Sequence, residues 1–298
     1  MDTIYHYCDA AAFLSIITNK QLWLTNTRKM NDHSEGFVIE KALVDWVKQG
    51  IDGQFGNLQL WPDDSIDKVK HALAMGRPEL YACCFSREKD STSQWLNYAD
   101  RARGFAIGFD PEKLWQNRLV PWNHSTFDGE RYVVPVRFSN QPEERLTLTP
   151  VLYVNRETVG SILSDRLWGN TRDFLSGGSP DAMVNTASFF SSIAKDASFR
   201  HESELRLIYA PSVMPAAPGS MGEPHVFGTI KPMKWRASAY GLTPHFEFNF
   251  PVDAIREIWI GPANPEHKDH AARHLLSTLL NLHGVWDVQL MESRSPYR

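Results

Sequence analysis

Two carboxylates lie two residues apart near the start of the stretch Phe199–Tyr209. Apolar residues alternate there at the period of an extended strand, at Leu205, Leu207 and Tyr209. On one strand Glu202 and Glu204 would project to the same face and repel, unless a cation, hydroxyls or a substrate lies between them. One interpretation is a solvated strand entrance in which Arg206 balances the charge. The other is a rigid carboxylate that stabilises positive charge developing in a cleft.

Further polar and aromatic residues lie at expected strand ends and helix starts. Each type has an ordinary explanation. A histidine near a terminus is usually packed or solvated, a serine at a helix start is usually a cap, and aromatics at helical spacing are usually core. Ser91 and Gln94 also match a capping box. The candidate binding residues are His6, Tyr7, Asn31, Ser86, Ser91, Ser93, Trp95, Tyr98 and Arg206, beside the candidate catalytic residues Glu204 and Glu202.

Common catalytic and metal motifs are missing from the sequence. It contains no G-x-G-x-x-G after a strand and no G-x-x-x-x-G-K-[ST], which disfavours a dinucleotide fold of that type and a P-loop. There is no H-E-x-x-H, no paired C-x-x-C and no G-x-S-x-G. His6 and Cys8 form one pair with ligand-like spacing, which is short of a metal site. We therefore predict no metal.

The composition is that of an ordinary globular protein. Of 298 residues, 42% are hydrophobic and 22% are charged. The formal net charge of -4 disfavours a protein that coats nucleic acid, although a local basic patch stays open. The three cysteines, Cys8, Cys83 and Cys84, cannot form a disulfide framework. With neither a signal-like start nor a membrane-length apolar run, the expectation is a soluble cytoplasmic protein without membrane contact.

Strands and helices are expected without strict alternation, which favours an α+β fold with mixed or antiparallel sheets and flanking helices. We expect one parallel crossover, near the C-terminus. One domain spanning residues 1–298 is predicted, with a lid or insertion at 50–78 and a loop break at 211–224. Strands are expected at 3–7, 21–24, 79–86, 104–110, 131–138, 145–154, 225–230, 245–250, 255–260 and 285–290, and within 199–209. Helices are expected at 10–18, 35–50, 65–75, 157–168, 181–197 and 267–282, and after Ser91.

Several short motifs, taken in their order, resemble the bacterial family known as domain of unknown function 2971. The resemblance extends from residue 4 to about residue 290. The motifs are Tyr5-His6-Tyr7, Met30-Asn31-Asp32 with Glu35, Cys84-Phe85-Ser86 followed by Trp95 and Tyr98, Gly104 to Asp110, Glu202-x-Glu204-x-Arg206, and Ile255 to Pro262.

That family is in turn similar, more distantly, to the ADP-ribosyltransferase superfamily, which implies an ADP-ribosyltransferase-like core and NAD as a substrate. By this similarity His6 holds the adenosine side of NAD, and Ser86 or the Ser91–Ser93 cluster shapes the nicotinamide pocket. Glu204 then completes the site, and Glu202 prepares an incoming nucleophile. Asn31 has no counterpart in the transferase pattern, and its polar character alone puts it in the same cleft.

The chemistry of such a site follows from the bond that breaks. Cleavage between nicotinamide and ribose leaves positive charge on the sugar, as in glycoside hydrolysis. A fixed carboxylate such as Glu204 stabilises that charge, and an imidazole can bond a ribose hydroxyl. Tyr7 or Tyr98 can stack on the nicotinamide.

The predicted function is therefore NAD-dependent ADP-ribose transfer to a macromolecular acceptor, protein or nucleic acid. An NAD glycohydrolase and a non-catalytic nucleotide- or partner-binding module are the alternatives. A toxin or phage-defence effector that modifies nucleic acid would also need a basic groove, for which the candidates are Arg101, Arg103, Lys195, Arg200 and Arg206. Each of the enzymatic hypotheses requires His6 and Glu204 to face each other across one cleft.

Overall fold

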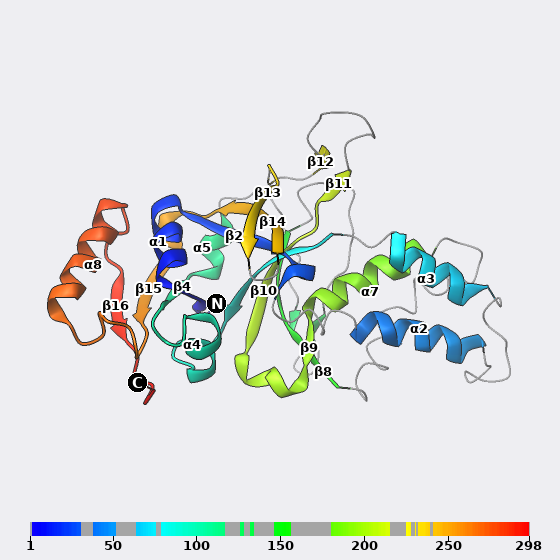
Figure 1. Cartoon of the computed structure of the whole chain (residues 1–298), viewed down its shortest axis with the longest axis horizontal. Helices are drawn as coiled ribbons and strands as arrows, with labels where there is room; N and C mark the ends of the chain where they lie inside the picture. The colour runs from blue at the N-terminus through cyan, green and yellow to red at the C-terminus, as the bar shows by residue number, and fades with distance from the viewer. Residues whose placement is uncertain are drawn as a thin grey trace.

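Strands from both ends of the chain meet in one large sheet, with helices at either end of the long axis (Figure 1). The computed structural model describes residues 2–30, 38–51, 64–75, 79–116, 126–127, 132–133, 146–155, 180–214, 225–227, 230, 232–238 and 241–297. Within these residues no helix combines the length and the apolar character that crossing a bilayer requires.

The large sheet has ten strands, and its main path runs β13-β14-β2-β3-β1-β4-β15-β16. β10 pairs with β3 and with β7, outside that path. The pairs are antiparallel except for β15 and β16, which are parallel. The strands are β1 (Ile4–Cys8), β2 (Gln21–Asn26), β3 (Tyr81–Ser86), β4 (Phe105–Phe109), β7 (Leu146–Pro150), β10 (Glu204–Tyr209), β13 (Lys234–Ser238), β14 (Gly241–Asn249), β15 (Ile255–Ile260) and β16 (Gln289–Glu292).

The sheet splits at β3, and this split creates the site described below. β10 pairs with β3 along its whole length, from Ser86 to Tyr81, and so occupies one edge completely. β2 and β1 must therefore share the other edge. β2 pairs with β3 at Tyr81 and Ala82, whereas β1 pairs with it at Ser86. Between these two contacts, residues 83–85 face a gap in the sheet.

Three two-stranded sheets and a set of helices complete the described structure. The small sheets pair β5 (Thr126–Phe127) with β6 (Tyr132–Val133), β8 (Leu152–Val154) with β9 (Ala194–Asp196), and β11 (Ser212–Met214) with β12 (His225–Phe227). The α-helices are α1 (Ala10–Asn19), α2 (Val38–Ile51), α3 (Ser65–Met75), α4 (Thr92–Tyr98), α5 (Pro111–Gln116), α7 (Asp181–Ile193) and α8 (His270–Leu282). Short 3-10 helices are η1 (Thr27–Lys29), η4 (Ala197–Glu202) and η5 (Val252–Ala254).

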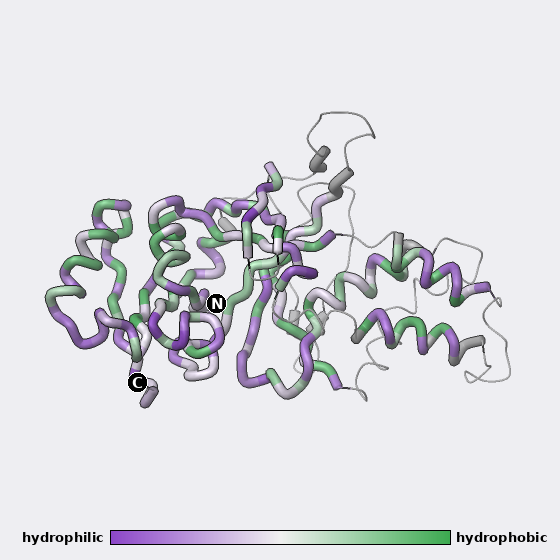
Figure 2. The backbone as a smooth tube through the Cα atoms, in the orientation of Figure 1, coloured by the Kyte–Doolittle hydropathy of each residue, from purple (hydrophilic) through white to green (hydrophobic). Residues whose placement is uncertain are grey.

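α2 and α8 are amphipathic, and α1 and α8 are capped by aspartates. Asp9 accepts a bond from the Ala12 amide, and Asp269 accepts from the amides of Ala271 and Ala272. Hydrophobic and hydrophilic residues alternate along α2 and α8 (Figure 2). α2, α3 and α7 contact one another at one end of the molecule, and α8 lies at the opposite end (Figure 1).

Central strands β3 and β10 are buried on both faces, which explains their nearly continuous apolar sequences. Leu205, Leu207 and Tyr209 point into the main core, where their partners are Phe85, Cys83 and Tyr81. Ala82 and Ile208 point to the other face and contact a second core formed with α2 and α7. Glu204 and Arg206 belong to this second face, because they alternate with the core residues.

The mixed α+β architecture predicted from the sequence is confirmed, as is the parallel crossover near the C-terminus, formed by β15, α8 and β16. A second parallel pair, β8 with β9, was not predicted. The predicted helix 10–18 and helix 65–75 are also present, the latter inside the segment assigned to a lid. The predicted helix 157–168 lies outside the described residues, as do most of the predicted strand 131–138 and most of the loop 211–224.

Four local predictions were wrong. The helix expected to reach residue 197 ends at Ile193, and the next residues form β9 against β8. Ser212–Met214, assigned to a loop, forms a strand, and β13 was not foreseen. The Ser91 side chain makes no capping bond to α4 and contacts the Ser93 hydroxyl instead, 3.0 Å away. The fourth prediction, that Glu202 and Glu204 share a strand, is corrected below.

Candidate ligand-binding site

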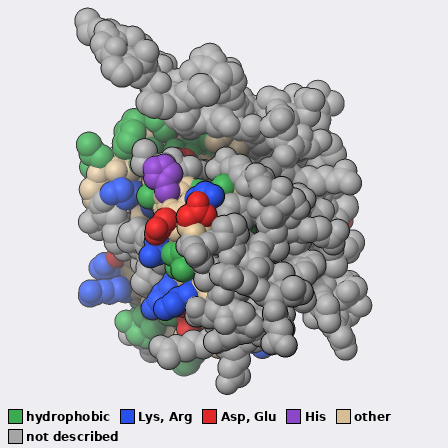
Figure 3. Space-filling view, turned by 90° about the vertical axis from the view of Figure 1, so that its right-hand side faces the viewer, with side chains coloured by type: hydrophobic (Ala, Val, Ile, Leu, Met, Phe, Trp, Pro, Cys, Tyr) green, Lys and Arg blue, Asp and Glu red, His purple; other side chains and the backbone are tan. Residues whose placement is uncertain are grey.

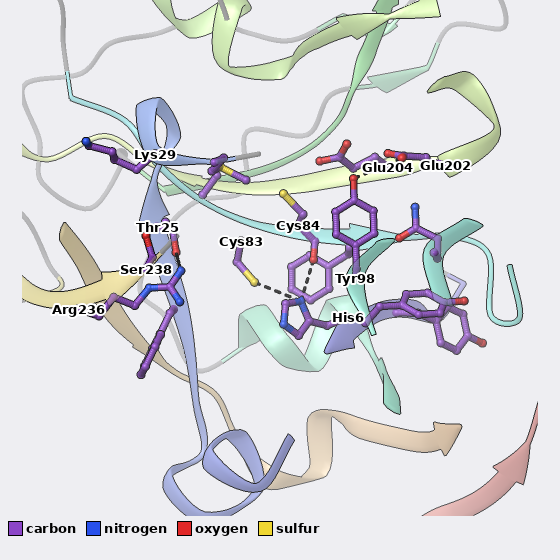
Figure 4. Close-up of a pocket in the computed structure, with 17 residues that line it drawn as sticks. His6, Thr25, Lys29, Cys83, Cys84, Tyr98, Glu202, Glu204, Arg236 and Ser238 are labelled. Carbon is purple, nitrogen blue, oxygen red and sulfur yellow. Dashed lines mark hydrogen bonds between the residues drawn. The ribbon is translucent and has the colours of Figure 1, made fainter. Parts of the chain in front are cut away.

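A pocket of about 360 Å³ lies at the gap where β2 and β1 separate along β3. This volume is at the small end of the range of about 300–1,000 Å³ that is usual for small-molecule sites. Glu202, Glu204 and Tyr98 lie on one side of it, Arg236, Thr25 and Ser238 on the other, with His6 between (Figure 4). We call the first side the acidic end and the second the basic end.

His6 occupies the gap itself. Its Nδ1 is 2.9 Å from the Cys84 carbonyl oxygen, which can only accept, so Nδ1 carries the hydrogen and donates it. The bond satisfies a carbonyl on the stretch of β3 that lacks a strand partner on this edge. In the neutral imidazole, Nε2 is then an acceptor. Burial lowers the pKa of His6, and the bond to Cys84 opposes this shift.

His6 and the carboxylates line the same pocket from opposite faces of the sheet. His6 pairs with Ile107 of the main core, and it alternates with Tyr5 and Tyr7, which belong to the other face. Figure 4 accordingly shows Cys84 between His6 and the two glutamates. The imidazole and the carboxylates therefore meet at the pocket on either side of the stretch of β3 that lacks a strand partner, residues 83–85.

The two glutamates do not share a strand, contrary to the sequence-based expectation. Glu202 ends the 3-10 helix η4, and Ser203 adopts a left-handed conformation with φ 47°. β10 begins only at Glu204, so a turn separates the two residues. The turn is fixed by the Ser86 hydroxyl, which donates to the Glu202 carbonyl oxygen at 2.6 Å.

A buried cluster of two acids and two bases forms the acidic end. Lys195 Nζ bridges the carboxylates, at 2.6 Å from Glu202 and 3.3 Å from Glu204. Arg206 Nε donates to the other Glu204 oxygen at 2.7 Å, and its Nη1 donates to the Ser192 carbonyl oxygen at 2.6 Å. Each of the four charged residues is at most 6% exposed. The cluster is therefore electrically balanced within the protein, as buried charges require.

Glu204 is held in its ionised form. Burial alone would raise its pKa, but the charge and hydrogen bonds of Arg206, followed by the charge of Lys195, lower the pKa to about 2. The Cys84 thiol also bonds to this carboxylate, and burial first, then the Glu204 charge, raise the Cys84 pKa well above its ordinary value. Cys84 is therefore a protonated thiol and a poor nucleophile.

The two carboxylate oxygens of Glu202 are held unequally. Its Oε2 accepts the short bond from Lys195, whereas its Oε1 accepts a longer bond of 3.3 Å from the Tyr98 hydroxyl. Tyr98 lies on α4, and Trp95 holds this helix against the sheet. The Trp95 indole donates to Asp90 at 2.7 Å, and the Trp95 ring packs edge-on against Tyr7. A ligand hydroxyl can replace the weak Tyr98 bond without disturbing Lys195.

The basic end contains a guanidinium that pairs with no carboxylate of the described residues. Arg236 of β13 lies over the Trp23 ring at 5.1 Å, and its Nη2 is 3.4 Å from the Thr25 hydroxyl. Its Nε is buried and has no hydrogen-bond partner among the described residues. Burial lowers the pKa of this arginine.

Sequence reasoning missed several of these residues. Nothing in a local pattern connects Arg236, Trp23 and Thr25, which meet only because β13, β14 and β2 are neighbours. Gln94 also lines the pocket, buried, and its carboxamide makes no hydrogen bond within the described part of the chain. The sequence assigns Gln94 to a capping box, which predicts a structural role for it and not a place in a pocket. For Lys195 the sequence suggested a basic groove, and not a partner of the two glutamates.

The pocket gathers five of the predicted site residues: His6, Tyr7, Tyr98, Glu202 and Glu204. Five other predicted site residues are described but do not line the pocket. Trp95 is fully buried, Ser86 bonds to the main chain of η4, and Arg206 supports Glu204. Ser91 and Ser93 bond to each other. These five residues, Ser86, Ser91, Ser93, Trp95 and Arg206, do not line the pocket, and Asn31 lies outside the described residues.

Of the five residues considered for a basic groove, three are engaged in ion pairs. Lys195 and Arg206 are buried in ion pairs, and Arg103 pairs with Asp100 at 2.9 Å. On the face seen in Figure 3, acidic, basic and histidine side chains lie next to one another near the centre of the described surface. The described residues contain no group of metal-ligating side chains.

One family model matches part of the chain. Residues 94–207 match the family described as "Protein of unknown function (DUF2971)". This region runs from α4 to β10 and contains the whole acidic cluster, but not His6 or the basic end. The resemblance over the remaining residues, and the similarity to ADP-ribosyltransferases, stay predictions. No curated protein and no solved structure matches the chain.

Proposed function

We propose that the pocket binds NAD as a substrate and that its acidic end promotes cleavage of the bond between nicotinamide and ribose. Nicotinamide leaves with the bonding electron pair, and positive charge develops on the ribose ring. The carboxylates of Glu204 and Glu202 stabilise this charge, and the Nε2 of neutral His6 accepts a bond from a ribose hydroxyl. The acceptor then attacks the ribose carbon and gives up its proton, which leaves ADP-ribose on a macromolecule, protein or nucleic acid.

The observation that carries this proposal is the presence of His6, Tyr98 and both carboxylates in one pocket. Tyr98 offers an aromatic face to the nicotinamide, and the opposite end offers a cation to the phosphates. The carboxylates are also held rigidly, since strand, 3-10 helix and Lys195 fix their positions. Fixed charge aimed at a developing charge is the arrangement that accelerates such a step.

The test compares nicotinamide release by the wild-type protein and by a charge-balanced variant. Glu204→Gln alone would leave a cation buried without its acid, so Arg206→Gln is added, which preserves the Lys195–Glu202 pair. We expect nicotinamide release, measured by chromatography, to fall by about a hundredfold to a thousandfold. The matched control is Asp100→Asn with Arg103→Gln, an exposed ion pair outside the pocket, and it should keep the wild-type rate.

The products distinguish transfer from hydrolysis. Mass spectrometry should find ADP-ribose attached to a macromolecule if transfer occurs, whereas free ADP-ribose alone would indicate an NAD glycohydrolase. Circular dichroism must show that both double variants are folded. A wild-type protein that releases no nicotinamide, or a Glu204 variant that retains the full rate, would disprove the proposal.

A second candidate is a non-catalytic nucleotide-binding module on the same fold. It is favoured by the balance of charge at the acidic end, because Lys195 and Arg206 already neutralise the two carboxylates. A neutralised carboxylate stabilises a developing cation less than an unpaired one. Calorimetric binding of NAD without release of nicotinamide would select this candidate.

A further inference from the structure

Two arginines near the pocket differ in how their charge is compensated. Arg206 is buried and contacts Glu204 through two of its nitrogens. Arg236 is partly buried and lines the pocket, yet none of the carboxylates in the described part of the chain pairs with it. A buried donor without an acceptor is unfavourable, because its lost bond to water is not replaced. Because Arg236 lines an open pocket, a bound ligand could supply the acceptor and the negative charge that it lacks.

The Arg236 side chain is held in place by its surroundings. Its guanidinium lies over the Trp23 ring at 5.1 Å, and the same ring contacts His245 with centroids 4.6 Å apart. Thr25 is 3.4 Å from one terminal nitrogen. The aromatic support and the hydroxyl orient the planar group, so little conformational freedom is lost when an anion binds.

The charge at this end fits a phosphate better than a carboxylate. Arg236 is the cationic group on which this end of the pocket depends, and no carboxylate of the described residues pairs with it. A phosphate presents several charged oxygens to which a guanidinium can donate two parallel bonds. At the other end Lys195 and Arg206 offset the glutamates, which weakens the repulsion that Glu202 and Glu204 would exert on an anion.

We propose that the basic end of the pocket is a phosphate-binding subsite centred on Arg236, and that the ligand is therefore a phosphorylated nucleotide and not a nucleoside or a free base. This inference deepens the proposed function, because it specifies how the diphosphate of NAD is placed and which end of the pocket receives it. The phosphates lie on the Trp23 side, and the ribose that loses nicotinamide lies towards Glu202.

The test measures binding of ADP and adenosine by isothermal titration calorimetry, with no requirement for turnover. The wild-type protein should bind ADP at least about tenfold more tightly than adenosine, and inorganic pyrophosphate should compete with ADP. In Arg236→Gln the affinity for ADP should fall about 10- to 100-fold, since a hydrogen-bonded charge pair is lost. Adenosine should bind this variant as it binds the wild type.

Two further variants make the result specific. Lys234→Gln removes the same charge from the same strand, but Lys234 is exposed, pairs with Glu247 and does not line the pocket, so ADP affinity should stay within about twofold. Arg236→Lys keeps the charge without the planar fork and should recover part of the affinity. It also supplies the measurement if Arg236→Gln fails to fold.

The outcomes separate this inference from the proposed function. ADP binding that depends on Arg236, without any cleavage of NAD, supports the subsite and rejects the enzyme. Cleavage of NAD by Arg236→Gln with unchanged KM and kcat supports the enzyme and rejects the subsite. Equal wild-type affinity for ADP and adenosine, no detectable binding of ADP at millimolar concentration, or ADP affinity unaffected by Arg236→Gln would each overturn the inference.

Discussion

The acidic and basic ends of the pocket treat charge in opposite ways. At the acidic end, two bases and two acids are buried together and satisfy one another at distances of 2.6–3.3 Å. At the basic end, Arg236 rests on an aromatic ring and keeps a buried nitrogen without a partner among the described residues. The first arrangement is complete within the protein, whereas the second is the one for which we propose a bound phosphate.

This difference separates contributions to stability from contributions to binding. Breaking a complete buried ion pair leaves an uncompensated charge and destabilises the fold strongly. Removing an uncompensated cation removes the desolvation cost of burying it, so stability changes little and the affinity for the ligand falls instead. Substitutions at the acidic end should therefore reduce stability, whereas substitutions at the basic end should reduce ligand binding.

The largest expected effect is the loss of stability in Arg206→Met. Glu204 would lose its closest cation, and the free energy of unfolding should fall by about 3–5 kcal/mol. Urea denaturation followed by circular dichroism measures this. Arg103→Met removes an arginine from an exposed ion pair and should change stability by less than about 1 kcal/mol. A loss below 1 kcal/mol for Arg206→Met would contradict the description of the acidic end as a coupled cluster.

A smaller effect is expected for the energetic coupling between Lys195 and Glu202. The two are 2.6 Å apart and almost fully buried, so their single substitutions should not be additive. In a double-mutant cycle with Lys195→Met and Glu202→Gln, measured by urea denaturation, the coupling should be about 0.5–3 kcal/mol. Additivity within about 0.3 kcal/mol would mean that the bridge contributes little.

The sequence predicted the apolar framework better than the polar site. Alternation and continuous apolar runs located β3, β4 and β10, because those patterns follow directly from burial on one or both faces. The same reasoning extended β10 backwards through Glu202. It could not detect the turn at Ser203, because a left-handed serine leaves no mark in the hydrophobic period.

The charge partners depend on contacts that a local pattern does not contain. Arg206 was recognised as a partner for the glutamates, since it is two residues from Glu204 in sequence. Lys195 was not, because the end of α7 and the strand β9 had to be known before it could be placed beside them. Arg236 depends on the order of strands across the sheet, which pairs β13 with β14 and β14 with β2.

His6 separates the two ends and should make stability depend on pH. Burial lowers its pKa, so the unfolded chain, with a histidine pKa near 6.5, binds more protons around and below that pH than the folded protein. The contribution is thus fully present above about pH 7.5 and is lost as the pH falls below about 6.5. The slope for one proton is at most about 1.4 kcal/mol per pH unit.

The variant His6→Asn isolates this contribution. Its amide can still donate to the Cys84 carbonyl oxygen, but it does not titrate. Urea denaturation between pH 7.5 and 5.5 should give a smaller slope for the variant than for the wild type. Burial also lowers the pKa of His245, but His245 contributes equally to the slope of both proteins, so its contribution cancels in the difference. Identical slopes would mean that His6 is solvated and is not the neutral centre of the pocket.

The smallest effect, and the most discriminating one, is expected for Arg236→Met. The substitution removes a buried nitrogen that lacks a partner, which favours the variant, and it also removes the cation from the Trp23 ring, which disfavours it by about 0.5–1 kcal/mol. Because the two terms oppose each other, the free energy of unfolding in urea should stay within about 1 kcal/mol of wild type. A loss of 3–5 kcal/mol, as expected for Arg206→Met, would show that Arg236 is already compensated within the protein. The two ends of the pocket would then be alike, and the basic end would need no ligand.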